Sequence, residues 1–228
     1  MSLKVSYDEI RREVGRFLGF DRDFDQWDET QAQDVEDIIK SGQRHFYWPL
    51  VADNETYIWS FLCVSVQMEL TSGTSHYRLP DDFIRPLSAF AFAAESEEIR
   101  LAIVTDHELR SMQSKGAPRG TPRYASIRSK NDKTDEGYEM LVYPTPDRAL
   151  VLDYRYEREP EFIGVSNPYH MGSAVHSELL ISACLMVADK MLNAEAISPD
   201  GGVHAQRFFK QLPTSVMIDM EALGAKLT

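Results

Sequence analysis

The segment SAVHSELLISACLMVADKM, residues 173–191, decides the fold of this chain. Its apolar residues recur at helical spacing and cover most of the circumference of an α-helix. A helix that is apolar on most of its sides must pack against several neighbours. The segment is therefore predicted to be the central core helix of a bundle.

A first helix is predicted near the N-terminus. Ser6 and Glu9 form a capping box, in which the serine oxygen accepts from an orphan backbone N–H and the glutamate reaches back to the cap. Apolar residues recur at helical spacing from Tyr7 to Leu18, and Gly19 supplies a permissive C-terminal stop. These features predict an amphipathic helix.

A second amphipathic helix follows an acidic stretch. Residues 21–37 contain eight acidic side chains and one arginine, and apolar residues at helical spacing follow from Ala32. The helix is expected to end before Pro49, because proline lacks an amide donor and disfavours helical geometry in the residue before it.

The C-terminal segment, residues 203–228, also has helical spacing. Pro213 lies inside it and is expected to kink or break the helix. Two interpretations are open: a helix packed in the core, or a docking arm that lays its apolar face into a groove of a partner. The arm is favoured, because a linker at residues 199–202 would release it.

The middle of the chain has the composition of a β-structure. β-branched and aromatic residues are interrupted there by polar turns, and one short helix is expected at residues 106–114, capped by Thr105 or Asp106. The predicted strands are residues 62–70, 76–79, 86–94, 99–104, 123–129, 138–143 and 149–156.

Helices at both ends thus enclose a β-rich middle. The predicted fold class is α+β, with a small helical bundle formed by residues 1–56 and 165–228. Residues 57–164 are predicted to form an inserted antiparallel β domain. At 228 residues the chain is long enough for one domain with a sizeable insertion.

Composition and charge exclude several classes of protein. The formal net charge of −12 argues against nonspecific wrapping of nucleic acid and against docking on anionic membrane, because both need basic surface. No apolar run approaches the ~18 residues that span a bilayer, so no membrane partner is expected. Cys63 and Cys184 lie far apart in apolar runs and are expected to be buried free thiols in a reducing cytoplasm.

No catalytic, cofactor or metal site is predicted, and the protein is not expected to be an enzyme. The run from Asp21 to Asp25 starts like a calcium loop, but Gln26 and Ala32 stand where glycine and glutamate are required. The triplet at residues 106–108, Asp-His-Glu, is interpreted as a capped, exposed turn, because adjacent helical residues point in different directions. Nucleophile, phosphate-loop and dinucleotide motifs are absent.

One segment reverses the sign of the charge. Residues 110–133 carry seven basic side chains and one acid, a net charge of +6, which leaves −18 for the rest of the chain. Such a segment is suited to an acidic face of a neighbouring copy or to passing DNA phosphates, and the alternative is a solvated loop. The predicted contact residues are Arg110, Lys115, Arg119, Arg123, Arg128 and Lys130.

Several short segments, in their order along the chain, resemble one known family. They are GQRHFYWP (42–49), YIWSFL (57–62), YRLPDDF (77–83), MLVYPTP (140–146) and YRY (154–156), followed by the apolar helix after Ser173. In this order the chain resembles the head-to-tail adaptor, or connector, proteins of tailed bacteriophages.

The resemblance implies a structural protein of the virion neck, made in the host cytoplasm. Such proteins form a ring, implied here to be a dodecamer, beneath the dodecameric portal, and contact tail or nozzle proteins on the other side. Double-stranded DNA passes through the lumen without specific binding, which an acidic protein favours. The portal-docking residues implied by this analogy are Phe208, Leu212, Met217, Met220 and Leu223.

Three alternatives are left open. Another neck or tail-completion protein would share the architecture without the portal contact. A DNA-binding regulator of packaging would use the basic segment and bind DNA with a steep salt dependence. A hydrolase using His107 or His176 with a nearby acid would need a concave pocket that gathers those side chains.

Overall fold

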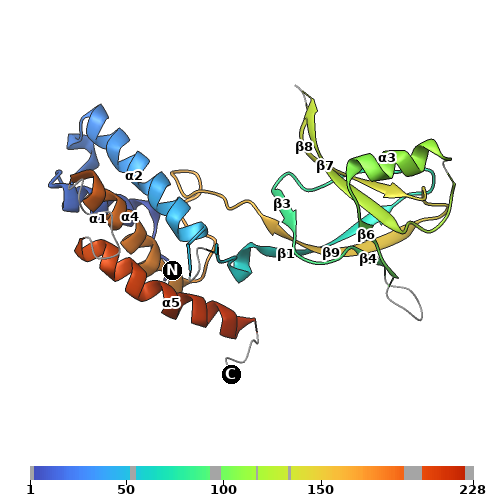
Figure 1. Ribbon diagram of the computed structural model, residues 1–228. Coiled ribbons are helices and arrows are strands. Elements are labelled where there is room, and N and C mark those ends of the chain that lie inside the picture. The colour runs from blue at the N-terminus through green and yellow to red at the C-terminus, as the bar shows by residue number, and fades with distance from the viewer. Residues whose placement is uncertain are drawn as a thin grey trace. The chain divides into compact units, whose positions relative to one another are not determined.

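A computed structural model describes residues 3–51, 55–92, 99–116, 118–132, 135–192 and 202–223. The chain forms two compact units, which are described separately. The first contains residues 1–61 and 160–228 and is helical; the second contains residues 62–159 and consists mainly of strands (Figure 1). The α+β class with an inserted sheet domain is therefore confirmed.

The helical unit is built around α4. Its helices are α1 (Tyr7–Leu18), α2 (Glu29–Tyr47), α4 (Ser177–Leu192) and α5 (Val203–Ala222), with short 3-10 turns η1 (Phe24–Gln26) and η4 (Ala174–His176). Helix α4 packs against α1, α2 and α5. This arrangement confirms that residues 173–191 supply the central core helix, because three neighbours cover most of its apolar circumference.

The predicted helix ends are also confirmed. The N–H of Glu9 donates to Ser6 Oγ at 3.3 Å, and the N–H of Ser6 donates to Glu9 Oε2 at 2.7 Å. Gly19 has φ of +81° and its N–H donates to the Arg16 carbonyl, so a residue without Cβ suits this position. Helix α2 ends at Tyr47, before Pro49.

Helices α2 and α4 approach closely at one glycine. A Cβ added to Gly42 would lie 2.6 Å from Cys184 Sγ, 2.7 Å from its Cα and 2.9 Å from its N. Cys184 is fully buried, and burial raises the pKa of its thiol to about 12. Cys63 is only half-buried, so the prediction of two buried thiols is wrong for this residue, which begins a strand at the edge of a sheet.

Helix α5 corrects one prediction. It is continuous from Val203 to Ala222, so Pro213 does not break it. Side chains on both sides of the proline hold the helix in place: Phe208 and Leu212 are buried before it, and Asp219 after it. Tertiary contacts therefore outweigh the loss of one backbone hydrogen bond.

The β unit contains two sheets (Figure 1). One consists of β1 (Cys63–Leu70), β3 (Phe83–Pro86), β4 (Ala91–Phe92), β5 (Ile99–Arg100) and β9 (Leu150–Arg158). The other consists of β2 (His76–Arg78), β6 (Ala102–Ile103), β7 (Tyr124–Asp132) and β8 (Asp135–Tyr143). The first and last strands, β1 and β9, pair antiparallel from Cys63 opposite Glu157 to Leu70 opposite Leu150, which closes the insertion.

Two details differ from the expected strands. The expected strand at 86–94 is interrupted after Pro86, where the N–H groups of Leu87 and Ser88 both donate to the Arg155 carbonyl before β4 begins. The expected strand at 99–104 is divided at Leu101, whose N–H donates to Phe90. Beyond it, β6 joins the other sheet and pairs parallel to β7, so the insertion is mixed and not wholly antiparallel.

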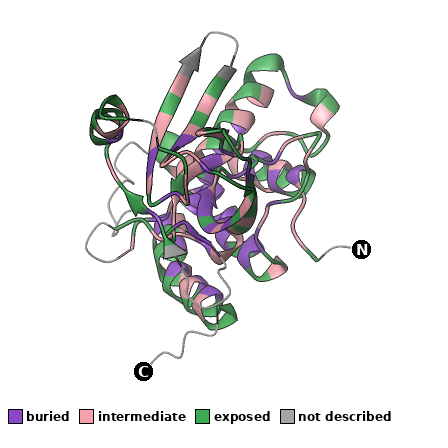
Figure 2. Cartoon of the chain, turned by 90° about the vertical axis from the view of Figure 1, so that its right-hand side faces the viewer, coloured by how far each residue is buried: buried purple, intermediate pink, exposed green. Residues whose placement is uncertain are grey.

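Strand alternation builds the core of the β unit. Leu152, Tyr154 and Tyr156 of β9 are buried, while Val151 and Arg155, on the alternate positions, are exposed. Both sheets contribute to one apolar cluster, and Figure 2 colours each described residue of the chain by its burial. The cluster contains Leu70, Leu79, Phe83, Phe90, Phe92, Leu101, Ala125, Met140, Val142, Leu152, Tyr154 and Tyr156.

Candidate interaction surfaces

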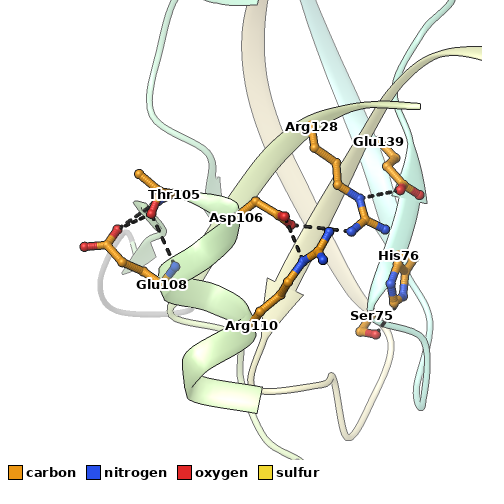
Figure 3. A network of polar contacts seen from close by, with 8 residues as sticks. All are labelled: Ser75, His76, Thr105, Asp106, Glu108, Arg110, Arg128 and Glu139. Carbon is orange, nitrogen blue, oxygen red and sulfur yellow. Dashed lines mark hydrogen bonds and ion pairs between the residues drawn. The ribbon is translucent and has the colours of Figure 1, made fainter. Parts of the chain in front are cut away.

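The Asp-His-Glu triplet at residues 106–108 forms the first turn of a helix. Helix α3 spans Asp106–Ser114, and Thr105 caps it: the N–H of Glu108 donates to Thr105 Oγ1 at 3.3 Å. In return, Glu108 Oε2 accepts from the Thr105 N–H and from its hydroxyl, both at 2.9 Å, and these two bonds lower the pKa of the Glu108 carboxyl (Figure 3). The capped, exposed turn predicted from the sequence is confirmed.

Two residues of the predicted basic contact set form an internal network (Figure 3). Arg128 Nε lies 2.6 Å from Glu139 Oε1, and Arg128 Nη1 lies 3.4 Å from Asp106 Oδ1. Arg110 Nε contacts the other oxygen of Asp106 at 2.8 Å. This network joins α3 to β7 and β8, so Arg110 and Arg128 each have an acidic partner within the β unit.

Three other basic residues are exposed in the segment between α3 and β7. Lys115, Arg119 and Arg123 form no ion pair within the described part of the chain. Their loop is held against the end of β8, because the N–H of Gly120 donates to the Thr145 carbonyl at 2.9 Å. They are the members of the set that remain available to a partner. The sixth member, Lys130, is half-buried in β7.

The predicted docking residues on α5 fall into two groups. Phe208 and Leu212 are 3% and 4% exposed and pack inside the helical unit, so they are not available while α5 stays on α4. Met217 and Leu223 are 47% and 55% exposed, and Met220 is half-buried. The docking role itself stays a prediction, but only the second group forms a surface.

A buried carboxylate that the sequence did not indicate fixes the end of α5. Asp219 is 2% exposed and accepts hydrogen bonds from the Tyr57 hydroxyl at 2.9 Å and from the N–H and Oγ of Ser60 at 2.7 and 2.5 Å. An aspartate in an amphipathic helix is typical of an exposed face, and only the spacing from Leu212 and Ser215 places it on the inner side.

Two histidines of the helical unit, His170 and His176, are core residues. His176 is buried against Trp59 and Phe61, with ring centroids 5.1 and 5.4 Å away, and burial lowers its pKa. His170 contacts Ser177 Oγ at 3.0 Å, and burial lowers its pKa to about 4. Both rings are therefore neutral near pH 7. Among the described residues, no three His, Cys, Asp or Glu side chains are placed to hold a metal ion.

Comparison with known proteins points to one family. The model of the SU10 adaptor protein family matches residues 5–223, which includes all of the β unit and most of the helical unit. No curated protein matches the chain. Within the described residues, no helix has the length and apolar character needed to cross a membrane.

Proposed function

Because the chain belongs to the SU10 adaptor protein family, a family of phage head-to-tail adaptors, we propose that it forms the ring that joins the portal to the tail. A phage adaptor is a structural component of the virion. The finer assignment proposed here is a homo-oligomeric ring in the neck, with twelve copies to match a dodecameric portal as the family resemblance implies.

The outer face of α5 is the observation that supports the portal contact. The inner face of this helix packs on α4, yet Phe209, Met217 and Leu223 are exposed on its other sides. A helix that is apolar on two faces and covered on one is suited to bind a second surface. Methionine adapts to irregular partners, so we assign portal docking to Met217, Met220 and Leu223.

The charge of the protein supports passage of DNA without binding. A protein with a net charge of −12 repels DNA phosphates, and it gains no binding free energy from the release of counterions from DNA. The basic segment does not reverse this, because Arg110 and Arg128 are paired with Asp106 and Glu139. We therefore assign its exposed residues to a neighbouring subunit or a tail protein, and regard the packaging regulator as the weaker alternative.

Cryo-electron microscopy of the protein mixed with the portal of the same phage tests this function. A symmetric extra ring at the narrow end of the portal is the expected result, with α5 against the portal. An intact portal without added density would overturn the portal contact and favour a neck or tail-completion protein. DNA binding that falls steeply with salt would instead favour the packaging regulator.

A further inference from the structure

An open groove follows α4 in the helical unit, with α1 on one side and α5 on the other. It consists of three adjoining hollows of about 650, 500 and 490 Å³. Glu13, Arg16 and Ile181 line both the first and the second hollow, while Glu178 and Arg207 line both the second and the third. The shared walls make the three hollows one continuous groove.

The floor of the groove is the side of α4 that none of the helices in the described residues covers. Helices α1, α2 and α5 pack against the rest of its circumference. The uncovered side presents Ile181, which is half-buried, and it continues to Val175, which is 54% exposed. An apolar strip of this kind is typical of a binding surface.

The rim of the groove carries an unusual share of the positive charge. The helical unit contains 11 basic and 20 acidic residues, a net charge of −9. Five of those basic residues line the groove, against three of the acids, Glu9, Glu13 and Glu178. The basic residues are Arg12, Arg16, Arg22, Arg207 and Lys210.

Part of this positive charge has no ion-pair partner among the described residues. Arg16 pairs with Glu13, and Arg207 pairs with Glu178 at 2.8 Å. Neither Arg22 nor Lys210 forms an ion pair with any residue that the structure describes. A groove with an apolar floor and free cations on its rim is suited to an acidic helical surface.

The same unit carries such a surface on its other side. Helix α2 packs on α4 away from α5, as Figure 1 shows. Its N-terminal half continues the acidic stretch of residues 21–37, and Asp28, Glu29 and Asp37 are exposed there. The acidic surface of α2 and the basic rim of the groove are therefore two different surfaces of the helical unit.

We propose that the groove of one copy receives the acidic N-terminal half of α2 from a second copy. The contact joins two different surfaces, so each subunit keeps one free groove and one free acidic face, and the contact repeats until a ring closes. This inference rests on the proposed ring and identifies the surfaces that build it. Since the rim charges are exposed, the contact is expected to weaken as salt rises.

Charge reversal on each surface tests the pairing. The groove variant is Arg22→Glu with Lys210→Glu, and the face variant is Glu29→Lys with Asp37→Lys. Each is expected to abolish ring formation while thermal unfolding stays close to that of the unmodified protein, because these groups are exposed and outside the core. Arg44→Glu, exposed on the C-terminal half of α2, is the matched control and should assemble normally.

Mixing the two variants at low salt is the sharper experiment and needs no portal. The intact groove of the face variant can accept the intact acidic face of the groove variant, and the reversed charges of the other two surfaces are again complementary. Sedimentation of the mixture should therefore show oligomers that contain both variants and that neither variant forms alone. Absence of these mixed oligomers, or rings formed by either variant alone, would overturn the interface. Failure of the unmodified protein to add a ring to the portal would instead overturn the proposed function, whatever the mixture shows.

Discussion

Asp219, near the end of α5, accepts a hydrogen bond of 2.9 Å from the hydroxyl of Tyr57, a residue 162 positions earlier in the chain. The same carboxylate accepts from Ser60, so one buried acid satisfies three donors. These bonds hold the C-terminal half of α5, beyond Pro213, on the helical unit. The segment predicted to be a docking arm is therefore anchored to the helical unit at Asp219.

Replacing Asp219 with alanine should destabilise the helical unit by about 2–4 kcal/mol, because the donors of Tyr57 and Ser60 lose a charged partner in a buried site. Tyr57→Phe removes one of these bonds and should cost about 1 kcal/mol. Urea unfolding measures both. Glu221→Ala, an exposed acid on the same helix, is the control and should change stability little. Equal effects of Asp219→Ala and Glu221→Ala would contradict the anchor.

Gly42→Ala should destabilise the packing of α2 on α4 by roughly 1–3 kcal/mol or more, since the added methyl would lie within 3 Å of Cys184. Two of the three close atoms belong to the backbone, so Cys184→Ala should not restore stability in the double variant. Thermal unfolding measures the loss. Full rescue by Cys184→Ala would show that the thiol alone sets the distance between the helices.

Local chemistry made much of the fold predictable from the sequence. The capping box at Ser6 and Glu9 and the cap at Thr105 depend on neighbours three residues away, so both could be located without tertiary information. Apolar residues on most sides of the helix expected at residues 173–191 likewise predicted that this helix is central. The continuity of α5 through Pro213 could not be predicted, because it depends on contacts with α4 and with the segment at residues 57–60.

The candidate surfaces were predicted less completely. The sequence shows which side chains are charged but not which of them form ion pairs. Arg128 was therefore predicted to contact a partner, although Glu139 lies opposite it in the register of β7 and β8. The predicted docking residues likewise differ in burial. Phe208 and Leu212 are buried although they follow the same helical spacing as the exposed residues of α5. The groove along α4 combines side chains from three helices, and no local pattern indicates it.

Stability should fall as the pH drops from about 6.5 towards 4, in part because of His170. Its pKa is lowered to about 4 in the folded protein by burial, and nearby Lys4 and His176 act in the same direction. In this range the unfolded chain binds the proton more readily, so folding becomes less favourable by up to about 3 kcal/mol. Urea unfolding at pH 7 and pH 4.5 measures the change. Carboxylates also titrate in this range, so His170→Gln is the control. Its free energy of unfolding should fall less between the two pH values than that of the unmodified protein. Identical losses of stability would contradict the role of His170.

The Arg128–Glu139 pair should contribute to the stability of the β unit. Both side chains are partly buried and their contact is 2.6 Å, so a double-mutant cycle with alanine should give a coupling energy of about 1 kcal/mol. Arg119→Ala and Arg123→Ala should leave stability unchanged, because these residues are exposed. If they contact a neighbour or the tail, their removal should weaken assembly instead. Unchanged assembly would contradict that role.

Portal docking should depend on the outer face of α5 and not on its inner face. Met217→Glu combined with Leu223→Glu places charge on exposed positions, so the subunit should stay folded while binding to the portal falls by at least tenfold. Pull-down on immobilised portal, with circular dichroism to check the fold, measures both effects. Deleting residues 203–228 is a poorer test, because it uncovers the side of α4 that Phe208 and Leu212 bury. Portal binding that survives the two glutamates would remove α5 from the docking surface, and the portal contact would then have to lie elsewhere on the chain.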